Sequence, residues 1–281
     1  MENVGSLYIV ATPIGNLDDI SRRALNILQQ VDFVAAEDTR HSRKLLSAYH
    51  IDTPMVALHE HNEASRAASL LDRIVAGENA ALVSDAGTPL ISDPGYALVN
   101  QARQRGIAVV PVPGACAAIT ALCASGLPTD RFLFVGFLPQ KEVARRQVVN
   151  ELLQQTVTVI CYESPRRILN FLQLMDELAP ERGLCLAKEL TKTFERYLVG
   201  TAAELLAVLQ EDASLQKGEW VVMVAGAGPK VAVDIGGDVL AAVELAAESL
   251  PLKMACELVA KITGFKKNQL YQATLQARGT K

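Results

Sequence analysis

The sequence predicts an α/β protein, because strand-length apolar runs alternate with helical periodicity along most of the chain. Four of these runs end in turns rich in Gly, Pro, Asp, Thr or Asn: 7–10, 33–36, 80–83 and 109–112. The carboxyl ends of parallel strands meet at one edge of a sheet, where α/β proteins bind their ligands. The four turns therefore predict one ligand pocket, built by the first half of the chain.

The first domain is expected to be a parallel sheet with helices on both faces. Amphipathic patterns predict three helices between or after its strands: 18–30, 62–76 and 94–105. Asp18 or Asp19 can cap the first of them. Small residues fill 114–127, which is also expected to be helical. We place the domain boundary near the start of this segment, so that residues 1–117 form the N-terminal α/β domain.

The second α/β domain is expected over residues 118–228. Apolar runs predict five strands: 132–136, 156–162, 184–188, 196–200 and 220–225. Helical patterns predict three helices: 141–154, 165–178 and 202–211. Strands 184–188 and 196–200 have no helix-length segment between them, so this sheet is expected to be partly antiparallel.

A small all-helical domain is expected at residues 229–281, where a Gly-rich linker precedes three helical patterns: 238–249, 252–262 and 266–277. The last two flank Thr263-Gly264-Phe265, a short turn of the kind found in helix-turn-helix motifs. From Pro251 to Lys281 there are six basic residues and one acid, so this segment carries +5 in a chain of net charge −4. A basic tail on an acidic body predicts contact with nucleic-acid phosphates.

Composition argues against several classes of protein. The apolar stretches are too short to span a bilayer, and the N-terminus lacks the basic flank and apolar core of a signal peptide. Five scattered cysteines without C-x-x-C spacing favour a reducing cytoplasm over disulfides or a zinc site. His59 and His61 would share a strand face but lack a third ligand at comparable spacing. We therefore expect a cytoplasmic protein that binds neither membrane nor metal.

The turns favour a cofactor that is partly cationic. No P-loop and no G-x-G-x-x-G motif follows a strand, and Lys and Arg are nearly absent from the four turns, Arg40 excepted. Acids are present at or beside the same turns: Glu37, Asp38, Asp85 and Asp93. S-adenosylmethionine combines an uncharged adenosine with a sulfonium and an ammonium group. It therefore matches these turns better than a nucleoside triphosphate does.

Six motifs accompany these turns and continue into the second domain: Thr12–Asp19, Glu37–Arg40, His59–Glu63, Ser84–Pro89 with Asp93–Gly95, Tyr162–Pro165 and Lys188–Lys192. Together they resemble the ribosomal RNA small subunit methyltransferase I family of the tetrapyrrole-methylase superfamily. The resemblance implies the class III methyltransferase type of fold, a homodimer, and S-adenosylmethionine in the cleft between two α/β domains. It also implies 2′-O-methylation of a cytidine ribose in the decoding region of 16S rRNA, with that rRNA or the small ribosomal subunit as partner.

Candidate cofactor-binding residues lie mainly in the turns of the first domain. The turn 84–89 is the strongest local signal, although Asp, Gly and Pro also form plain tight turns. The residues assigned to the cofactor in this domain are Pro13, Ser84, Asp85, Ala86, Gly87, Leu90, Cys116 and Ala117. The resemblance adds Tyr162 and Leu190, which would face the adenine; without it, they are equally well interpreted as ordinary core residues.

A ribose hydroxyl is a weak nucleophile, and a neighbouring carboxylate or histidine that accepts its proton assists the transfer. The candidates for this general base are Asp38, Glu37 and His61, in that order. Asp38 has a competing structural interpretation, because Asp38 or Thr39 can cap a helix over 40–49.

Three basic residues are expected to contact RNA: Arg40 beside the second turn, and Lys266 and Lys267 in the basic tail. Two other functions remain compatible with the same patterns. One is a methyltransferase of the same scaffold that acts on a tetrapyrrole or a protein acceptor. The other is a non-catalytic, RNA-binding ribosome assembly factor.

Overall fold

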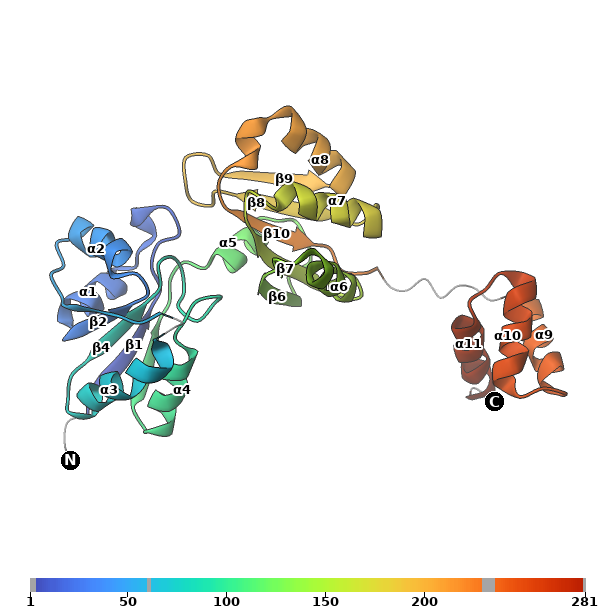
Figure 1. Cartoon of the computed structure of the whole chain (residues 1–281), viewed down its shortest axis with the longest axis horizontal. Helices are drawn as coiled ribbons and strands as arrows, with labels where there is room; N and C mark the ends of the chain where they lie inside the picture. Colours follow the sequence, from blue (N-terminus) through green and yellow to red (C-terminus); the bar gives the residue numbers. More distant parts are fainter. Residues whose placement is uncertain (1–3, 60–61, 229–235, 280–281) are drawn as a thin grey trace. The chain divides into compact units, whose positions relative to one another are not determined.

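The computed structural model describes residues 4–59, 62–228 and 236–279 (Figure 1). The chain divides into two compact units, Met1–Gly226 and Ala227–Lys281. Within the described residues, the first unit contains two five-stranded sheets and the second contains three helices. None of the described helices is long and apolar enough to cross a bilayer. The fold class predicted from the sequence is confirmed, while the domain boundary expected at residue 117 stays a prediction.

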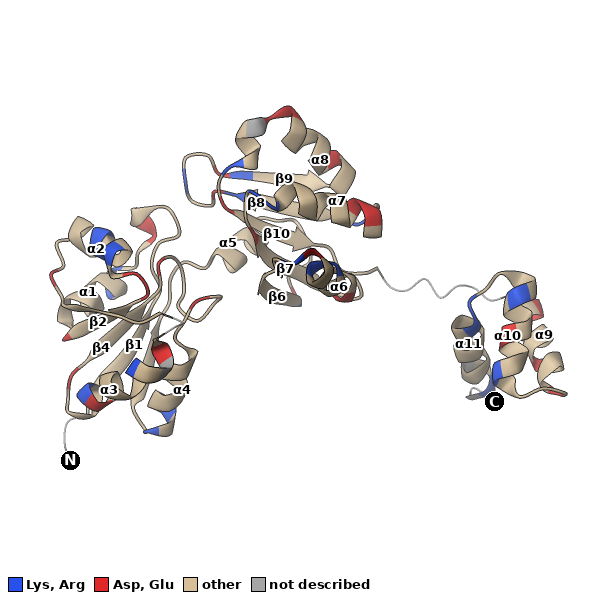
Figure 2. Cartoon of the chain, viewed as in Figure 1, with Lys and Arg blue, Asp and Glu red and all other residues tan. Residues whose placement is uncertain are grey.

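The first sheet is wholly parallel, as predicted, with strand order β3-β2-β4-β1-β5. Its strands are β1 Ser6–Val10, β2 Phe33–Ala36, β3 Met55–Ala57, β4 Ala80–Val83 and β5 Ala108–Val112. Every residue of β2 and β4 is buried, and no strand of this sheet carries a charge (Figure 2). The three-residue strand β3 is only half-buried, which is why its sequence gave no strand signal.

Helices cover both faces of this sheet. One pair, α1 Arg22–Gln30 and α2 Thr39–Ala48, buries Ala24, Leu28 and Leu46 in one hydrophobic cluster. The other pair, α3 Glu63–Val75 and α4 Tyr96–Gln104, packs into a separate cluster.

The first helix begins at Arg22, four residues later than the periodicity predicts. Ser21 caps it by accepting a hydrogen bond from the backbone three residues ahead (3.1 Å). Asp18 and Asp19 lie instead in a separate 3-10 turn that Asn16 caps, so the prediction that either caps the helix is wrong. An Asn side chain that bonds the backbone two residues ahead competes with helix formation at these positions.

The second sheet is mixed, as predicted, with strand order β6-β7-β10-β8-β9. Only the β6–β7 pair is parallel, and the other three pairs are antiparallel. The strands are β6 Phe132–Phe137, β7 Thr158–Glu163, β8 Leu184–Lys188, β9 Arg196–Gly200 and β10 Trp220–Val224. The associated helices are α5 Ala117–Cys123, α6 Glu142–Leu152, α7 Ile168–Leu178, α8 Ala202–Glu211 and the 3-10 turn Ala213–Gln216.

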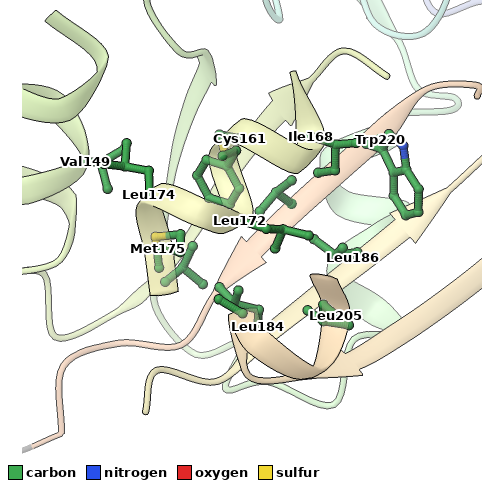
Figure 3. Close-up of a cluster of buried hydrophobic side chains, with 14 of the residues drawn as sticks. Val149, Cys161, Ile168, Leu172, Leu174, Met175, Leu184, Leu186, Leu205 and Trp220 are labelled. Carbon is green, nitrogen blue, oxygen red and sulfur yellow. The ribbon is translucent and has the colours of Figure 1, made fainter. Parts of the chain in front are cut away.

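The largest hydrophobic cluster lies between this sheet and α7 (Figure 3). Ile168, Leu172 and Met175 of α7 are buried beside Leu186 and Trp220. Burial of each such side chain contributes about 1.5–3 kcal/mol. On the opposite face, α5 packs against the same strands in a second cluster. The sheet is therefore fixed from both sides, which holds the ends of its strands in place.

The second unit consists of α9 Gly237–Ala247, α10 Leu252–Thr263 and α11 Lys267–Gly279. Val243, Cys256 and Leu270, one from each helix, are completely buried in its small core. Gly264 ends α10 with a φ of +79°, a left-handed conformation that glycine adopts without a side-chain clash. The predicted glycine turn between the last two helices is confirmed.

Candidate active site

The turns after β1 and β4 are fastened to each other by two backbone hydrogen bonds. The Thr12 amide donates to the Gly87 carbonyl (2.8 Å), and the Gly87 amide donates to the Thr12 carbonyl (3.0 Å). Gly87 has a φ of +85°, and a Cβ on it would lie 3.3 Å from Ile14. A larger residue at 87 would therefore strain the backbone and crowd the turn after β1.

This pair of turns forms a wall with a cavity on each side. The larger cavity, of about 300 Å³, is lined by Ile14 and by the residues that follow Asp85. The smaller, of about 280 Å³, is lined by Pro13, Gly15 and Asp85 together with residues of α2. The single pocket expected from the sequence is thus divided, and adjacent residues of each turn line different cavities.

Most of the expected cofactor residues line the larger cavity. They come from the turn after β4, from the start of α5 and from the second sheet: Ala86, Gly87, Cys116, Ala117, Tyr162 and Leu190. Both sheets therefore contribute to this cavity.

The other expected cofactor residues lie around the larger cavity without lining it. Pro13 and Asp85 face the smaller cavity instead. Ser84 is buried, and its hydroxyl donates to the carbonyls of Ala86 and Gly87 (3.5 Å each). Leu90 packs against the core on the α3 and α4 side, and its neighbour Ile91 lines the cavity.

The larger cavity has an apolar slot between aromatic rings. Tyr162 makes edge-on contacts with Phe134 and Phe137, with ring centroids 5.0 and 5.4 Å apart. The Tyr162 hydroxyl accepts a hydrogen bond from the Ala118 amide in the first turn of α5 (3.2 Å). Burial, and after it the neighbouring Cys116, raise the pKa of Tyr162 to about 12, so the phenol is neutral at physiological pH. An adenine ring needs an apolar slot of this kind.

Two buried polar atoms in the wall of the larger cavity have no partner among the described residues. They are the free carboxylate oxygen Oε2 of Glu163 and the indole Nε1 of Trp220, which belong to paired positions on β7 and β10. The other oxygen of Glu163 accepts from Arg167 (2.6 Å) and from the Ser164 amide (2.7 Å). A buried group left without a hydrogen bond costs about 1–3 kcal/mol, so these atoms favour a ligand with both a donor and an acceptor.

One acid of the first domain, Asp93, lines the larger cavity, and it lies close enough to Asp85 and Glu37 for their charges to interact. Burial raises the pKa of Asp93, and the neighbouring Asp85 raises it further. Burial likewise raises the pKa of Glu37, followed by the charges of Asp93 and Asp85. Carboxylates that repel each other in this way are stabilised by a nearby cation. The wall therefore fits the sulfonium and ammonium groups of S-adenosylmethionine, and its slot and orphaned polar atoms fit the adenosine.

Backbone strain marks two loops that meet this cavity. Five described residues other than glycine have a φ between +50° and +73°, and four of them lie in loops beside the cavity. These four are Leu90 and Ser92 after β4, and Glu189 and Thr191 after β8. Such conformations cost about 1–3 kcal/mol each, and they cluster at functional sites. The strain therefore supports a binding role for both loops.

The candidate general bases differ in their surroundings. Asp38 caps α2, and its carboxylate accepts from the Arg40 amide (2.8 Å) and from the Arg40 guanidinium (3.1 Å). The Arg40 hydrogen bonds lower the pKa of Asp38 to about 2. Glu37, whose pKa is raised, interacts with Asp93 and Asp85 but lines neither cavity. His61 lies outside the described residues.

The expected RNA-binding residues are exposed, but two of the three are paired with acids. Arg40 holds Asp38, and the Lys267 ammonium lies 2.6 Å from a Glu257 carboxylate oxygen. Lys266 makes no ion pair with any described residue. Within the described residues, no group of three or more His, Cys, Asp or Glu is placed to hold a metal ion.

The sequence did not single out Thr88, Ile91, Phe137, Glu163 or Trp220 as site residues, although all five line the larger cavity. Phe137 and Trp220 reach it only because of the strand order of the second sheet. For Glu163, the Tyr162–Pro165 motif was a usable signal, since the motif directly follows a buried strand.

Two family models and several curated proteins match this chain. Residues 6–206 match the family model described as Tetrapyrrole (Corrin/Porphyrin) Methylases, and residues 233–278 match the RsmI C-terminal HTH domain. The chain is 53% identical to the Ribosomal RNA small subunit methyltransferase I of Pasteurella multocida, over 97% of each chain. It is 50% identical to the protein of that name from Pseudomonas aeruginosa, over 99% of each chain.

A solved structure shares the fold at low sequence identity. It is uroporphyrin-III C-methyl transferase from Thermus thermophilus complexed with S-adenyl homocysteine. The TM-score is 0.52 at 17% identity, and the match covers 78% of this chain and 97% of that one.

Proposed function

This chain belongs to the ribosomal RNA small subunit methyltransferase I family of the tetrapyrrole methylases, and on that premise we propose its acceptor and its general base. It is an S-adenosylmethionine-dependent rRNA methyltransferase. The proposed acceptor is the 2′ oxygen of a cytidine ribose in the decoding region of 16S rRNA. We further propose that the enzyme works in the cytoplasm as a homodimer.

The observation that carries the proposal is the larger cavity, which combines an apolar slot, orphaned polar atoms and an acidic wall. Bound S-adenosylmethionine would supply a methyl group on a sulfonium, which is already reactive toward an oxygen nucleophile. Ala86 and Gly87 would hold it from the turn after β4, and Cys116 and Ala117 from the start of α5. Asp93 would offset its positive charge within the cavity.

Glu37 is the proposed general base, ahead of Asp38. A base with a raised pKa accepts a proton more readily than one held near 2 by an arginine. Glu37 is most active when ionised, so the rate should rise as the pH increases through its raised pKa. The hydrogen bonds to Asp38 instead support a structural role for that residue at the start of α2.

The acceptor is tested by mapping the methylated nucleotide by mass spectrometry after incubation of purified enzyme with S-adenosylmethionine and unmodified small ribosomal subunits. The proposal predicts one added methyl on a cytidine ribose of 16S rRNA. A methyl on a base, or transfer only to a tetrapyrrole or a protein, would contradict it. Tight cofactor binding without any transfer would indicate the non-catalytic assembly factor.

The base is tested by comparing Glu37→Gln with Asp38→Asn, since asparagine can still cap α2. We expect Glu37→Gln to lower kcat by about 10²- to 10⁴-fold while S-adenosylmethionine still binds. Asp38→Asn should retain most of kcat. The opposite ranking, with cofactor binding intact in both variants, would return the role to Asp38.

A further inference from the structure

The smaller cavity lies on the far side of the wall from the proposed cofactor site. Pro13, Gly15 and Asp85 line it, while their neighbours Ile14 and Ala86 line the larger cavity. The backbone pairing of Thr12 with Gly87 holds the two turns together. The two cavities are therefore lined by neighbouring residues of the same two turns.

The opposite side of the smaller cavity is the basic helix α2. His41, Lys44 and Leu45 of this helix line the cavity, as expected for residues three and four positions apart on one helix face. The sequence of α2 carries three Lys or Arg residues and no acid (Figure 2). Of these three, Lys44 lines the cavity and provides the positive charge on its α2 side.

Two cations of α2 have no partner in the part of the chain that the structure describes. The side chains of Arg43 and Lys44 are exposed and make no ion pair or hydrogen bond with any described residue. Arg40, by contrast, is held by Asp38. Exposed, unpaired cations on one short helix attract phosphate, because neither must first give up an internal partner.

The rest of the smaller cavity suits a sugar or a base. Pro13, Leu17 and Leu45 provide apolar walls, and Asp85 provides a carboxylate. One oxygen of Asp85 accepts from the Asp38 amide (3.1 Å). The carboxylate is an acceptor only, so it can receive a hydrogen bond from a ribose hydroxyl or a base amino group and would repel a phosphate. Phosphate and sugar are thus expected on opposite sides of the cavity.

From this arrangement we propose that the smaller cavity and α2 form a ribonucleotide subsite for the acceptor strand. A backbone phosphate lies against Lys44 and Arg43, and the attached nucleoside enters between Leu45 and Asp85. The strand is thereby positioned so that the acceptor ribose reaches the rim of the cofactor cavity. Lys44 is a positioning residue in this scheme. The inference rests on the proposed function, because it takes the acceptor to be RNA.

The decisive variants are Lys44→Ala, which removes the phosphate contact, and Leu45→Trp, which fills the cavity. Arg131→Ala is the matched control, since Arg131 is exposed, lacks an ion pair with any described residue and precedes β6 on the other sheet. KM for small ribosomal subunits, kcat and calorimetric S-adenosylmethionine affinity are measured for each, with the melting temperature as a check of folding.

We expect Lys44→Ala to raise the KM for subunits about tenfold, and Leu45→Trp to lower kcat/KM by at least as much. S-adenosylmethionine affinity should stay within about twofold of wild type in both variants. Arg131→Ala should change neither the KM for subunits nor kcat/KM. Unchanged subunit KM and kcat/KM in both folded variants would overturn the subsite. Wild-type enzyme that methylates no rRNA would instead overturn the proposed function, so the two failures are distinguishable.

A second measurement needs no turnover. Acetylation of surface lysines is followed by mass spectrometry with and without unmodified small ribosomal subunits. Lys44 should be protected at least several-fold by subunits and not by S-adenosylmethionine alone. Equal acetylation of Lys44 in the presence and absence of saturating subunits would also overturn the subsite.

Discussion

Helix α2 in the first unit and the C-terminal helical unit both present basic residues, but they differ in the share that remains unpaired: two of three Lys or Arg residues in α2, against two of the five that the structure describes in the C-terminal unit. The C-terminal segment is basic by count, yet Lys267 and Lys261 both face Glu257, and Arg278 holds Glu244. Arg43 and Lys44 of α2 face no acid among the described residues. We therefore expect cations without internal partners, rather than net charge along the sequence, to mark the RNA-binding surface.

Helix α9 and the residue after it lower the net charge of the C-terminal unit. Helix α9, which lies before the +5 segment in sequence, brings Asp238, Glu244 and Glu248 into the same small unit. The charge of the folded unit is lower than that of its last two helices. Among the residues of this unit that the structure describes, Lys253 and Lys266 are the exposed Lys or Arg residues without an ion pair.

The largest effect on binding to small ribosomal subunits is expected from variants that reverse the charge of the unpaired cations in each region. Arg43→Glu with Lys44→Glu in α2 is expected to weaken binding to small ribosomal subunits about 100-fold, because two phosphate contacts become repulsive. Lys253→Glu with Lys266→Glu should weaken it about tenfold. Filter binding at fixed salt measures both. Equal losses of affinity, or a larger loss for the C-terminal variant, would contradict the expected difference between the two regions.

The salt dependence of binding should separate paired from unpaired lysines. Lys44→Ala should reduce the slope of log affinity against log salt by about 0.7, since one phosphate contact to single-stranded RNA is lost. Lys267→Ala should leave the slope nearly unchanged, because Glu257 already neutralises that lysine. A larger change of slope for Lys267→Ala would show that RNA displaces the glutamate.

Removing Glu257, the acid that pairs with two lysines of the C-terminal unit, should strengthen RNA binding by that unit. Hydrogen bonding to Lys267 lowers the pKa of Glu257, so this carboxylate is charged at neutral pH. Glu257→Gln frees Lys261 and Lys267 and is expected to raise RNA affinity about threefold. Competition binding against wild type provides the measurement. Glu248→Gln is the control, since Glu248 has no ion pair with a described residue.

The smallest effect, on stability rather than on RNA binding, is expected for the Asp38–Arg40 ion pair at the start of α2. The pKa of Asp38 is lowered to about 2, mainly by the Arg40 side chain. A carboxyl whose pKa is lower in the folded state stabilises the fold at pH values above its pKa in the unfolded state. This contribution is lost as the pH falls through about 2. Arg40→Ala should raise the pKa of Asp38 toward its usual 3.8, as followed by NMR titration. An unchanged titration midpoint would contradict the assigned pair.

Much of the fold could be predicted because its signals are local. The buried strands of the first sheet read as apolar runs, and the absence of a helix between 184–188 and 196–200 revealed the antiparallel part of the second. The errors are local as well. Ser21 rather than Asp18 or Asp19 caps the first helix, because the Asn16 turn uses those residues. Strand β3 was missed because it is short and half-buried.

The candidate site was only partly predictable for a different reason. Ala86, Gly87, Cys116 and Ala117 could be assigned because they follow strand ends of a parallel sheet. Which side of a turn a residue faces depends on backbone pairing, and this separates Asp85 from Ala86. No periodicity in the sequence encodes that separation.

By itself, the sequence determined the alternation of strands and helices, the acidic turns and the family, because these depend on neighbours along the chain. Only the tertiary structure decided that the turns enclose two cavities and that Glu163 and Trp220 meet across β7 and β10. It also decided which lysines and arginines keep their charge free. The physical reason is that pairing, burial and electrostatic neutralisation depend on distance in space, which separation in sequence does not fix.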